Sequence, residues 1–509
     1  MPVLDTDVII VGAGPSGLML AGELRLAGVR TLVLERQPAI RDVPKASGIG
    51  GRILDLLRYR GLLERFEAAS GDPHVAARFP FGDVYLDLTN MAEPPMRALP
   101  LPQREIERIL DAHASDLGAE IRRANQVIGV SQDPGTVTAE VRGPDGEYRV
   151  SARYLVGCDG GRSRIRELAG IDFPGTTYPQ VNRFAAVTVS DAVTVLENGD
   201  IEVPGLGVVH AGFTRTERGA FAFAATPGGL SLMTTEDETA EYDDDEPLTL
   251  AELGASITRV LGAELPLTGS TRLSRFTFKD RQAERYSAGR ILVAGDAAHL
   301  FPATGTALNV GMLDTVNLAW KLAADVQGRA PAGLVDTYHD ERHLAGARAR
   351  LQTRAQVALR RGHDPAADAL RTVVQELLTD EQPLERLGNL VGHNDIRYPM
   401  PGANPHPLAG AFAPDLTLHT EDGVTDVATL MHAARPVLLI LTDRPDLHTA
   451  ASDWRERVEI RTGKTADRPA DALLIRPDAH VAWAARIDES ADTAGESLRA
   501  ALTAWFGTP

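Results

Sequence analysis

The chain has 509 residues, a length that exceeds one hydrophobic core, so we expect two or three domains. Its hydrophobic content of 43% and charged content of 24% are typical of a globular protein, and no apolar run is long enough to span a membrane. The formal net charge of −18 argues against a nucleic-acid partner, because nucleic-acid phosphates require a basic face. The single cysteine, Cys158, excludes a disulfide framework within the chain, and we expect a cytoplasmic protein.

The predicted elements begin with an apolar strand that runs into a glycine turn and a helix, in residues 5–17 (DTDVIIVGAGPSG). A second strand follows and ends on Glu35, which completes the dinucleotide-binding fingerprint in its structural context. Gly12 allows the tight turn, Gly14 lets the backbone approach a pyrophosphate, and Gly17 lets the helix lie close to the strand. The first N–H groups of the helix favour phosphate, and Glu35 is suited to bind an adenosine ribose.

The rest of the chain divides by its pattern of apolar residues and turn residues. Apolar spacing predicts helical stretches around 54–63 and 103–117, and the sequence GPDG at 143–146 predicts a β-hairpin. Short β-rich runs broken by Gly and Pro predict an inserted antiparallel sheet from 181 to 280. After a proline-rich linker, strands and helices alternate from residue 436 onward, which indicates a separate α/β domain.

Two further segments carry polar residues directly after predicted strands. The segment 158–166 (CDGGRSRIR) opens a helix with Asp159 and Gly160 at its start, and 295–299 (GDAAH) has Asp296 at the end of a strand. Ligands of open α/β sheets bind beyond the carboxyl ends of the strands, so Asp296 can accept hydrogen bonds from a ribityl chain. The glycine turn alone leaves FAD, NAD and a Rossmann domain without a ligand as alternatives, and these two segments decide between them.

The three motifs, in this order and with the β-rich insert between the last two, resemble the group A flavoprotein monooxygenases, the p-hydroxybenzoate hydroxylase-like enzymes. The segment 475–483 (IRPDAHVAW) is similar to the aromatic polyketide hydroxylases, whose third domain is thioredoxin-like without redox cysteines. The resemblance covers essentially the whole chain. It implies an α/β fold with a Rossmann-like FAD-binding domain (1–180 and 281–395), an inserted antiparallel β-sheet substrate domain (181–280) and a C-terminal thioredoxin-like α/β domain (396–509) that is redox-inert.

The resemblance also implies roles for individual residues. The glycine motif and Glu35 hold the ADP half of FAD, Gln103 contacts the flavin side, Asp159 lies at the pyrophosphate, and Asp296 binds the ribityl chain. The candidate cofactor-binding residues are Gly12, Gly14, Pro15, Ser16, Gly17, Glu35, Arg36, Lys45, Gln103, Asp159, Gly160, Asp296, Pro302, Gly305, Leu308 and Asn309. The family has no second nucleotide-binding domain, so NAD(P)H docks transiently as a co-substrate. We assign no catalytic residue and no metal ligand.

Two segments depart from the pattern of the family. Where relatives carry Ser-Arg-Ala, this chain has Pro-Lys-Ala, and Lys45 keeps the charge but lacks the bidentate fork of arginine. The loop 302–309 beside the flavin ring is one residue shorter than usual, with Ala307 at an expected glycine. Backbone N–H groups of this loop stabilise negative charge on reduced flavin in the family, so the altered loop bears on flavin redox chemistry rather than on flavin binding.

The leading hypothesis is an FAD-dependent, NAD(P)H-consuming monooxygenase of antibiotic biosynthesis, which hydroxylates a polyketide-type small molecule through a flavin C4a-hydroperoxide. The alternative is a non-redox, FAD-requiring [4+2] cyclase (a Diels-Alderase) of the spirotetramate, pyrroindomycin type, which the altered loop 302–309 suggests. A flavin-binding scaffold without activity is a third hypothesis. We expect a monomer or homodimer with neither a membrane nor a nucleic acid as partner.

Four other candidate residues receive structural interpretations. His339 and His343 lie one helical turn apart but match no zinc motif, which predicts a surface helix. His299, beside the third motif, is expected to be structural, and Trp320 is expected to lie in the core.

Overall fold

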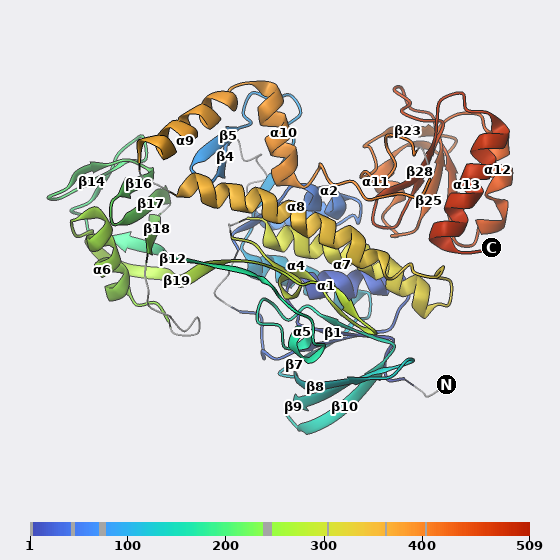
Figure 1. The fold of residues 1–509 in the computed structure, drawn as a ribbon, viewed down its shortest axis with the longest axis horizontal. Coiled ribbons are helices and arrows are strands. Elements are labelled where there is room, and N and C mark those ends of the chain that lie inside the picture. Colours follow the sequence, from blue (N-terminus) through green and yellow to red (C-terminus); the bar gives the residue numbers. More distant parts are fainter. Residues whose placement is uncertain are drawn as a thin grey trace.

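The computed structural model describes residues 4–41, 46–70, 78–226, 228–237, 247–302, 305–361, 364–402 and 405–509. Figure 1 shows an elongated molecule: a β-rich region lies at one end, the C-terminal α/β unit lies at the other, and the nucleotide-binding fold lies between them. Among the described residues, no helix has the length and hydrophobicity needed to cross a membrane.

The central element is a six-stranded sheet of order β20-β21-β11-β1-β2-β7, parallel except for β20. Its strands are β20 (Ser287–Ala288), β21 (Ile291–Val293), β11 (Tyr154–Gly157), β1 (Val8–Val11), β2 (Thr31–Glu35) and β7 (Glu120–Arg123). Side chains of β1 alternate between two cores: Val8 and Ile10 pack with the helices, while Ile9 and Val11 pack with a second, smaller sheet. Burial on both faces explains why these strands are continuously apolar.

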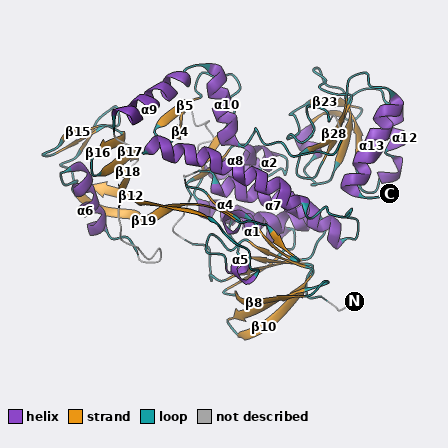
Figure 2. Ribbon diagram, in the orientation of Figure 1, coloured by secondary structure: helices purple, strands orange, loops and turns teal. Residues whose placement is uncertain are grey.

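Helices cover one face of this sheet and a three-stranded sheet covers the other (Figure 2). The helices are α1 (Pro15–Leu26), α2 (Arg52–Arg58), α3 (Leu63–Ser70), α4 (Gln103–Asp116), α7 (Ala307–Val326) and α8 (Thr337–Arg360), with the pair β3 (Gly48–Gly50) and β6 (Ala98–Pro100) beside them. The second sheet comprises β8 (Gln126–Gln132), β9 (Val137–Gly143) and β10 (Gly146–Ala152), with the short helix α5 (Arg164–Leu168). The hairpin predicted at 143–146 joins β9 to β10, as expected. The helical stretch predicted around 54–63 is two helices, because Gly61 has a φ of +65° and ends the first.

The β-rich region is a six-stranded antiparallel sheet of order β16-β17-β18-β12-β19-β22. Its strands are β16 (Gly212–Thr216), β17 (Gly219–Thr226), β18 (Gly229–Asp237), β12 (Gly175–Val189), β19 (Leu267–Gln282) and β22 (His299–Leu300). Helix α6 (Leu250–Leu261) packs on one face, and its ends are fixed by the Thr249 cap and by Gly262 at a φ of +81°. The small sheet β13 (Thr194–Val195), β14 (Ile201–Val203) and β15 (Gly207–Val209) lies at the far end. Strand β22 begins at His299, the last residue of the motif 295–299, so this sheet is joined to the central one at that motif.

Helices α9 (Pro365–Leu377) and α10 (Glu381–Gly392) pack over the hairpin β4 (Arg78–Phe81) and β5 (Val84–Asp87) (Figure 1). His339 and His343 on α8 are half-buried rather than fully on the surface, because both rings pack against Tyr286, with centroids 5.7 Å and 5.6 Å from it. Trp320 is a core residue as expected, in contact with Trp505.

The C-terminal unit is built on a four-stranded sheet of order β26-β25-β27-β28. Only the β25–β26 pair is parallel, which is the arrangement of a thioredoxin-like βαβ–ββα unit. Its elements are β23 (Thr417–Thr420), β24 (Gly423–Asp426), α11 (Val427–Leu430), β25 (Val437–Ile440), α12 (Pro445–Ala450), β26 (Glu459–Thr462), β27 (Ala472–Ile475), β28 (Val481–Ala485) and α13 (Ala491–Phe506). Buried Arg60, paired with Glu23 of α1, donates to the carbonyls of Met431 and Pro477 and so attaches this unit to the nucleotide-binding fold.

Candidate FAD-binding site

The three sequence motifs and Glu35 meet at one edge of the central sheet. Strands β21, β11, β1 and β2 are neighbours and run parallel, so their carboxyl ends lie side by side. The glycine turn follows β1, Asp159 follows β11, Asp296 follows β21, and Glu35 ends β2. In open α/β sheets this edge is where ligands bind.

The three glycines of the first motif have different environments. A Cβ on Gly12, whose φ is +106°, would lie 2.4 Å from the Cys158 carbonyl oxygen, and one on Gly17 would lie 2.0 Å from the Gly12 carbonyl oxygen. These two glycines therefore permit close packing of the turn. A Cβ on Gly14 would meet no heavy atom within 4 Å. Gly14 thus faces open space, as a backbone that must approach a ligand requires.

The start of helix α1 is suited to an anion. Pro15 occupies its first turn, and the N-cap residue, Gly14, supplies no side-chain hydrogen bond to the free N–H groups. These N–H groups and the positive end of the helix dipole form the usual site for a pyrophosphate. Ser16 turns inward from the same helical turn and packs against Gly295 and Gly311.

Glu35 supports the glycine turn from the end of the neighbouring strand. Its carboxylate accepts hydrogen bonds from the backbone N–H groups of Ala13 (2.8 Å) and Gln37 (2.7 Å). These contacts fix the carboxylate beside the glycine turn, where a ribose interaction would have to form. Arg36, the next residue, is exposed.

Asp159 binds the first turn of α5, the helix that the second motif opens and whose N-cap residue is Ser163. Its carboxylate accepts hydrogen bonds from the Ser163 hydroxyl (2.5 Å) and the Ile165 N–H (3.1 Å), and burial raises its pKa. The side chain therefore shapes the turn, while Gly160, with a φ of +86° and open space at its Cβ position, exposes the backbone. Arg166 donates to the carbonyl of Ala297 at 3.0 Å and so links the second motif to the third.

The residues expected beside the flavin ring lie around the start of α7. Asn309 accepts a hydrogen bond from the Gly50 N–H (3.3 Å) and donates to the Gly305 carbonyl (2.9 Å). Pro302 is buried and Leu308 is half-buried, whereas Gly305 is exposed.

Gln103 is the first residue of helix α4. It accepts from the Ala46 N–H at 3.2 Å and donates to Glu107 at 2.7 Å, so it fixes the backbone next to Lys45. Lys45 itself lies outside the described residues.

One buried acid near the third motif was not found by sequence reasoning. Asp314 of α7 accepts hydrogen bonds from the Gly295 N–H (3.1 Å), His299 Nε2 (2.7 Å) and Arg342 Nε (2.7 Å). The sequence signal is an acid that follows the apolar run 310–313 (VGML) within α7. His299 is structural, as expected, since its Nε2 is bound to Asp314 and its ring stacks on Phe301 at 4.7 Å.

The carboxyl edge of the central sheet has the features that FAD binding requires. The open Cβ positions at Gly14 and Gly160, the uncapped start of α1 and the acid at the end of β2 match the requirements of an adenine dinucleotide. Within the part of the chain that the structure describes, there is no group of three His, Cys, Asp or Glu side chains that could hold a metal ion.

Comparison with known proteins agrees with this geometry. The FAD binding domain family matches residues 5–353, and the family described as aromatic-ring hydroxylase, C-terminal, matches residues 406–509. The chain therefore belongs to the FAD-dependent aromatic-ring hydroxylases, a family of flavoprotein monooxygenases.

Individual relatives cover nearly the whole chain. The 12-dehydrotetracycline 5-monooxygenase/anhydrotetracycline 6-monooxygenase of Streptomyces rimosus is 40% identical, over 99% of each chain. The solved structure of the anhydrotetracycline hydroxylase OxyS from Streptomyces rimosus is 40% identical, with a TM-score of 0.87 and 99% of each chain covered. The structure of the Diels-Alderase PyrE3 of pyrroindomycin biosynthesis is 36% identical, with a TM-score of 0.80, over 99% of this chain and 100% of that one.

Proposed function

We propose that this chain is an NAD(P)H-dependent monooxygenase that adds one oxygen atom to an electron-rich ring or enol of a polyketide-type small molecule. The observation that carries the proposal is the convergence of the four segments predicted to bind FAD at one edge of the central sheet. Strand β22 joins this edge to a second sheet that has partly exposed phenylalanines on one face. The tetracycline relatives support the substrate class.

The two faces of the antiparallel sheet differ in burial. Ala185 and Val187 face α6 and are fully buried. Phe184 and Phe276 alternate with them onto the opposite face and are only half-buried, and Phe278 lies 5.7 Å from Phe276 on the same strand. The Arg272 guanidinium lies 4.7 Å from the Phe184 ring and that of Arg360 lies 5.8 Å from the Phe278 ring, so this face combines aromatic and cationic groups. We propose that it binds the flat ring system of the substrate.

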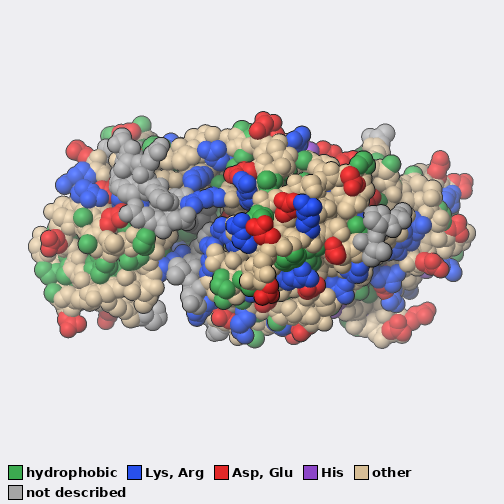
Figure 3. Space-filling model, turned by 90° about the horizontal axis from the view of Figure 1, so that it is seen from below, with side chains coloured by type: hydrophobic (Ala, Val, Ile, Leu, Met, Phe, Trp, Pro, Cys, Tyr) green, Lys and Arg blue, Asp and Glu red, His purple; other side chains and the backbone are tan. Residues whose placement is uncertain are grey.

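The proposed co-substrate is an anion, and the charge distribution supports its docking. Although the net charge is −18, Lys and Arg side chains gather where the β-rich region meets the body of the molecule (Figure 3). Local positive potential of this kind attracts a dinucleotide phosphate. The single glycine motif leaves FAD as the resident nucleotide and NAD(P)H as a transient one.

When bound at this edge, FAD would supply the redox and oxygen-activating chemistry of the proposed reaction, with NAD(P)H as the reductant and O2 as the source of the transferred oxygen atom. The role of the protein is to bind the cofactor and the substrate and to orient them. The start of α1 would hold the pyrophosphate, Glu35 the ribose and Asp296 the ribityl chain, and the antiparallel sheet would orient the substrate and keep water from it. No side chain is assigned as a general base. We propose the three domains predicted from the sequence. Strand β12 of the substrate domain, however, begins at Gly175, before the predicted boundary at residue 181.

A second candidate function is a non-redox [4+2] cyclase that needs FAD only as a structural element. Two observations favour it: the resemblance to the Diels-Alderase PyrE3, and Ala307 at an expected glycine position, where helix α7 begins. Such an enzyme shapes its substrate for an intramolecular reaction and needs no co-substrate.

The holoenzyme is mixed anaerobically with NADPH in one experiment and with NADH in another. We expect the flavin absorbance to bleach, and we expect anhydrotetracycline to accelerate the bleaching. Under labelled oxygen, the product of anhydrotetracycline or of another aromatic polyketide should gain one labelled oxygen atom by mass spectrometry. A product of unchanged mass, formed with oxidised FAD and without NADPH, would favour the cyclase. Comparison of the two bleaching rates identifies the preferred nicotinamide coenzyme.

A further inference from the structure

Helix α7 carries polar side chains into the interior of the protein, and Asp314 is the first of them after the loop at 302–309. Its side chain is 0% exposed, and so is that of its partner His299. Burial opposes ionisation of this carboxyl, but the adjacent His299 and Arg342 outweigh burial and hold its pKa below the usual value. A buried, charged carboxylate is stable only when donors saturate it.

Two of the three donors to Asp314 come from the third motif. The Gly295 N–H and His299 Nε2 both contact Asp314 Oδ2, at 3.1 Å and 2.7 Å. These residues are the first and last of the segment GDAAH, and Asp296 lies between them. The Asp314 carboxylate therefore binds both ends of the turn that carries Asp296, the residue proposed to bind the ribityl chain.

The packing around Gly295 leaves this turn little freedom. A Cβ on Gly295, whose φ is +63°, would lie 2.7 Å from Ser16 Oγ. A Cβ on Gly311, one helical turn before Asp314, would lie 2.6 Å from Ser16 Oγ and 3.0 Å from the Cα of Gly295. The turn is thus packed tightly between α1 and α7, and the hydrogen bonds to Asp314 fix its position relative to α7.

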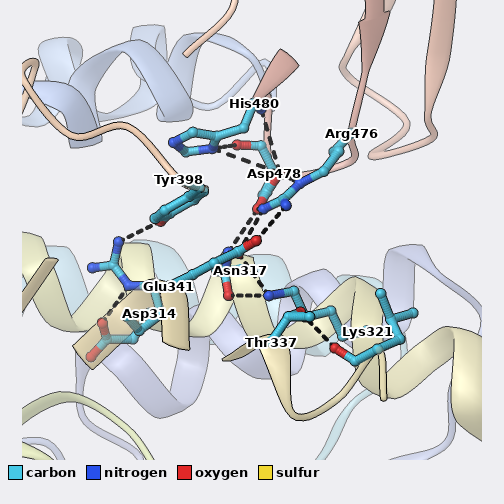
Figure 4. Close-up of polar contacts among 11 residues, drawn as sticks. Asp314, Asn317, Lys321, Thr337, Glu341, Tyr398, Arg476, Asp478 and His480 are labelled. Atoms are coloured by element: carbon cyan, nitrogen blue, oxygen red, sulfur yellow. Dashed lines mark hydrogen bonds and ion pairs between the residues drawn. The ribbon is translucent and has the colours of Figure 1, made fainter. Parts of the chain in front are cut away.

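The third donor connects Asp314 to other parts of the chain. Arg342 of α8 donates to Asp314 Oδ1 and to the hydroxyl of Tyr398, each at 2.7 Å (Figure 4). Tyr398 lies near the start of the C-terminal domain, and the centroid of its ring lies 4.3 Å from that of His480. The contact with Arg342 stabilises the pairing of the two helices and does not touch the third motif.

We propose that Asp314 is a positioning residue of the FAD site: without touching the cofactor, it fixes the turn Gly295–His299 so that Asp296 is held toward the ribityl chain. The proposal rests on the FAD site described above, and not on whether the enzyme hydroxylates or cyclises its substrate. Asp314 thus has two separable roles. The pair with Arg342 contributes stability, and the hydrogen bonds to Gly295 and His299 contribute FAD affinity.

The matched variants Asp314→Ala and Arg342→Met separate these roles, because both break the same buried ion pair and only the first releases the turn. We expect Asp314→Ala to raise the Kd for FAD by about tenfold or more, as loss of charge-assisted hydrogen bonds implies. Arg342→Met should raise it by less than about threefold. The Kd is measured by quenching of FAD fluorescence on the apoprotein, below the melting temperature of each variant. The visible circular dichroism of bound FAD should change only in Asp314→Ala.

Asp314→Asn provides a second variant in case the alanine variant does not fold. Its side-chain oxygen can still accept from the Gly295 N–H, so its Kd should lie between those of the wild type and Asp314→Ala. Equal Kd values for Asp314→Ala and Arg342→Met at equal losses of melting temperature would overturn the proposal, as would wild-type affinity in both Asp314 variants. Neither measurement uses substrate or NADPH, so failure of the proposed monooxygenase reaction would leave this test unchanged.

Discussion

The variant Gly14→Val is expected to fold like the native chain and to purify without FAD. Gly14 has a φ of −80° and a ψ of −179°, extended backbone that any residue adopts, and its Cβ position is open. We therefore expect the apoprotein to lose about 1 kcal/mol or less, the usual cost of a poor N-cap residue. Valine would occupy the space that the pyrophosphate needs, and the affinity for FAD should fall at least about a hundredfold. The flavin-to-protein ratio and the melting temperature of the apoprotein measure the two effects.

Gly17→Ala is the control for a general disturbance of the turn. Its Cβ would lie 2.0 Å from the Gly12 carbonyl oxygen, so the backbone must shift and the apoprotein itself should be destabilised. Loss of FAD together with an intact apoprotein is thus expected only for Gly14→Val. If that variant retained one FAD per chain, the assignment of the glycine turn to the pyrophosphate would be wrong.

Local patterns made much of this fold predictable. The glycine turn, the hairpin at Gly143–Gly146 and the helix from Gln103 depend on residues close in sequence, whose periodicity and turn preferences are readable one segment at a time. The strand ends that carry Glu35, Asp159 and Asp296 converge because neighbouring parallel strands share an edge, which general rules of α/β sheets imply.

Contacts between distant segments were not predictable in the same way. The acid at 314 has no local partner, and its donors His299 and Arg342 become neighbours only when α7, α8 and the third motif pack together. Arg60 donates to the carbonyl of Pro477, which is 417 positions away, and no periodic pattern in the sequence indicates this contact. The loop at 302–309, on which the two functional hypotheses differ, includes residues 303–304, which lie outside the described chain.

The junction between α7, α8 and the C-terminal unit is a buried cluster of charges (Figure 4). Arg476 of the C-terminal unit is 0% exposed and binds both oxygens of Glu341, at 2.6 Å and 2.8 Å, and Asp478 at 2.5 Å. Asn317 donates to Glu341 and Asp478, and Lys321 donates to Glu341 at 2.8 Å. Burial opposes ionisation of Glu341, but the charges of Arg476 and Lys321 outweigh it and lower its pKa to about 2. The segment that resembles the polyketide hydroxylases, IRPDAHVAW, thus supplies the contact that joins the last unit to the rest.

Arg476→Met is expected to lower the free energy of unfolding by about 3–5 kcal/mol, because the buried carboxylates of Glu341 and Asp478 both lose their guanidinium partner. Lys321 still contacts Glu341, and His480 lies 3.7 Å from Asp478. The rings of Trp320 and Trp505 lie 5.3 Å and 4.6 Å from the Arg476 guanidinium carbon, so tryptophan fluorescence during urea unfolding reports the change. The control Arg468→Met removes a partly exposed arginine from its pair with buried Asp471 at 3.3 Å. Asp471 keeps its pair with Arg444 at 2.9 Å, so this change should cost about 1 kcal/mol or less. Equal losses in the two variants would contradict a special role for the buried cluster.

The pH dependence gives an independent test of the same cluster. Because the pKa of Glu341 is lowered from its ordinary value of 4.5 to about 2 in the folded protein, its contribution to stability is complete above 4.5 and is lost as the pH falls toward 2. Without Arg476, the pKa of Glu341 should rise toward or above its ordinary value, since burial then acts with less opposition. The stability difference between wild type and Arg476→Met should therefore shrink as the pH is lowered from 5 to 2, whereas the Arg468→Met difference should change little. A difference independent of pH would mean that Arg476 contributes through packing against its aromatic neighbours and not through charge.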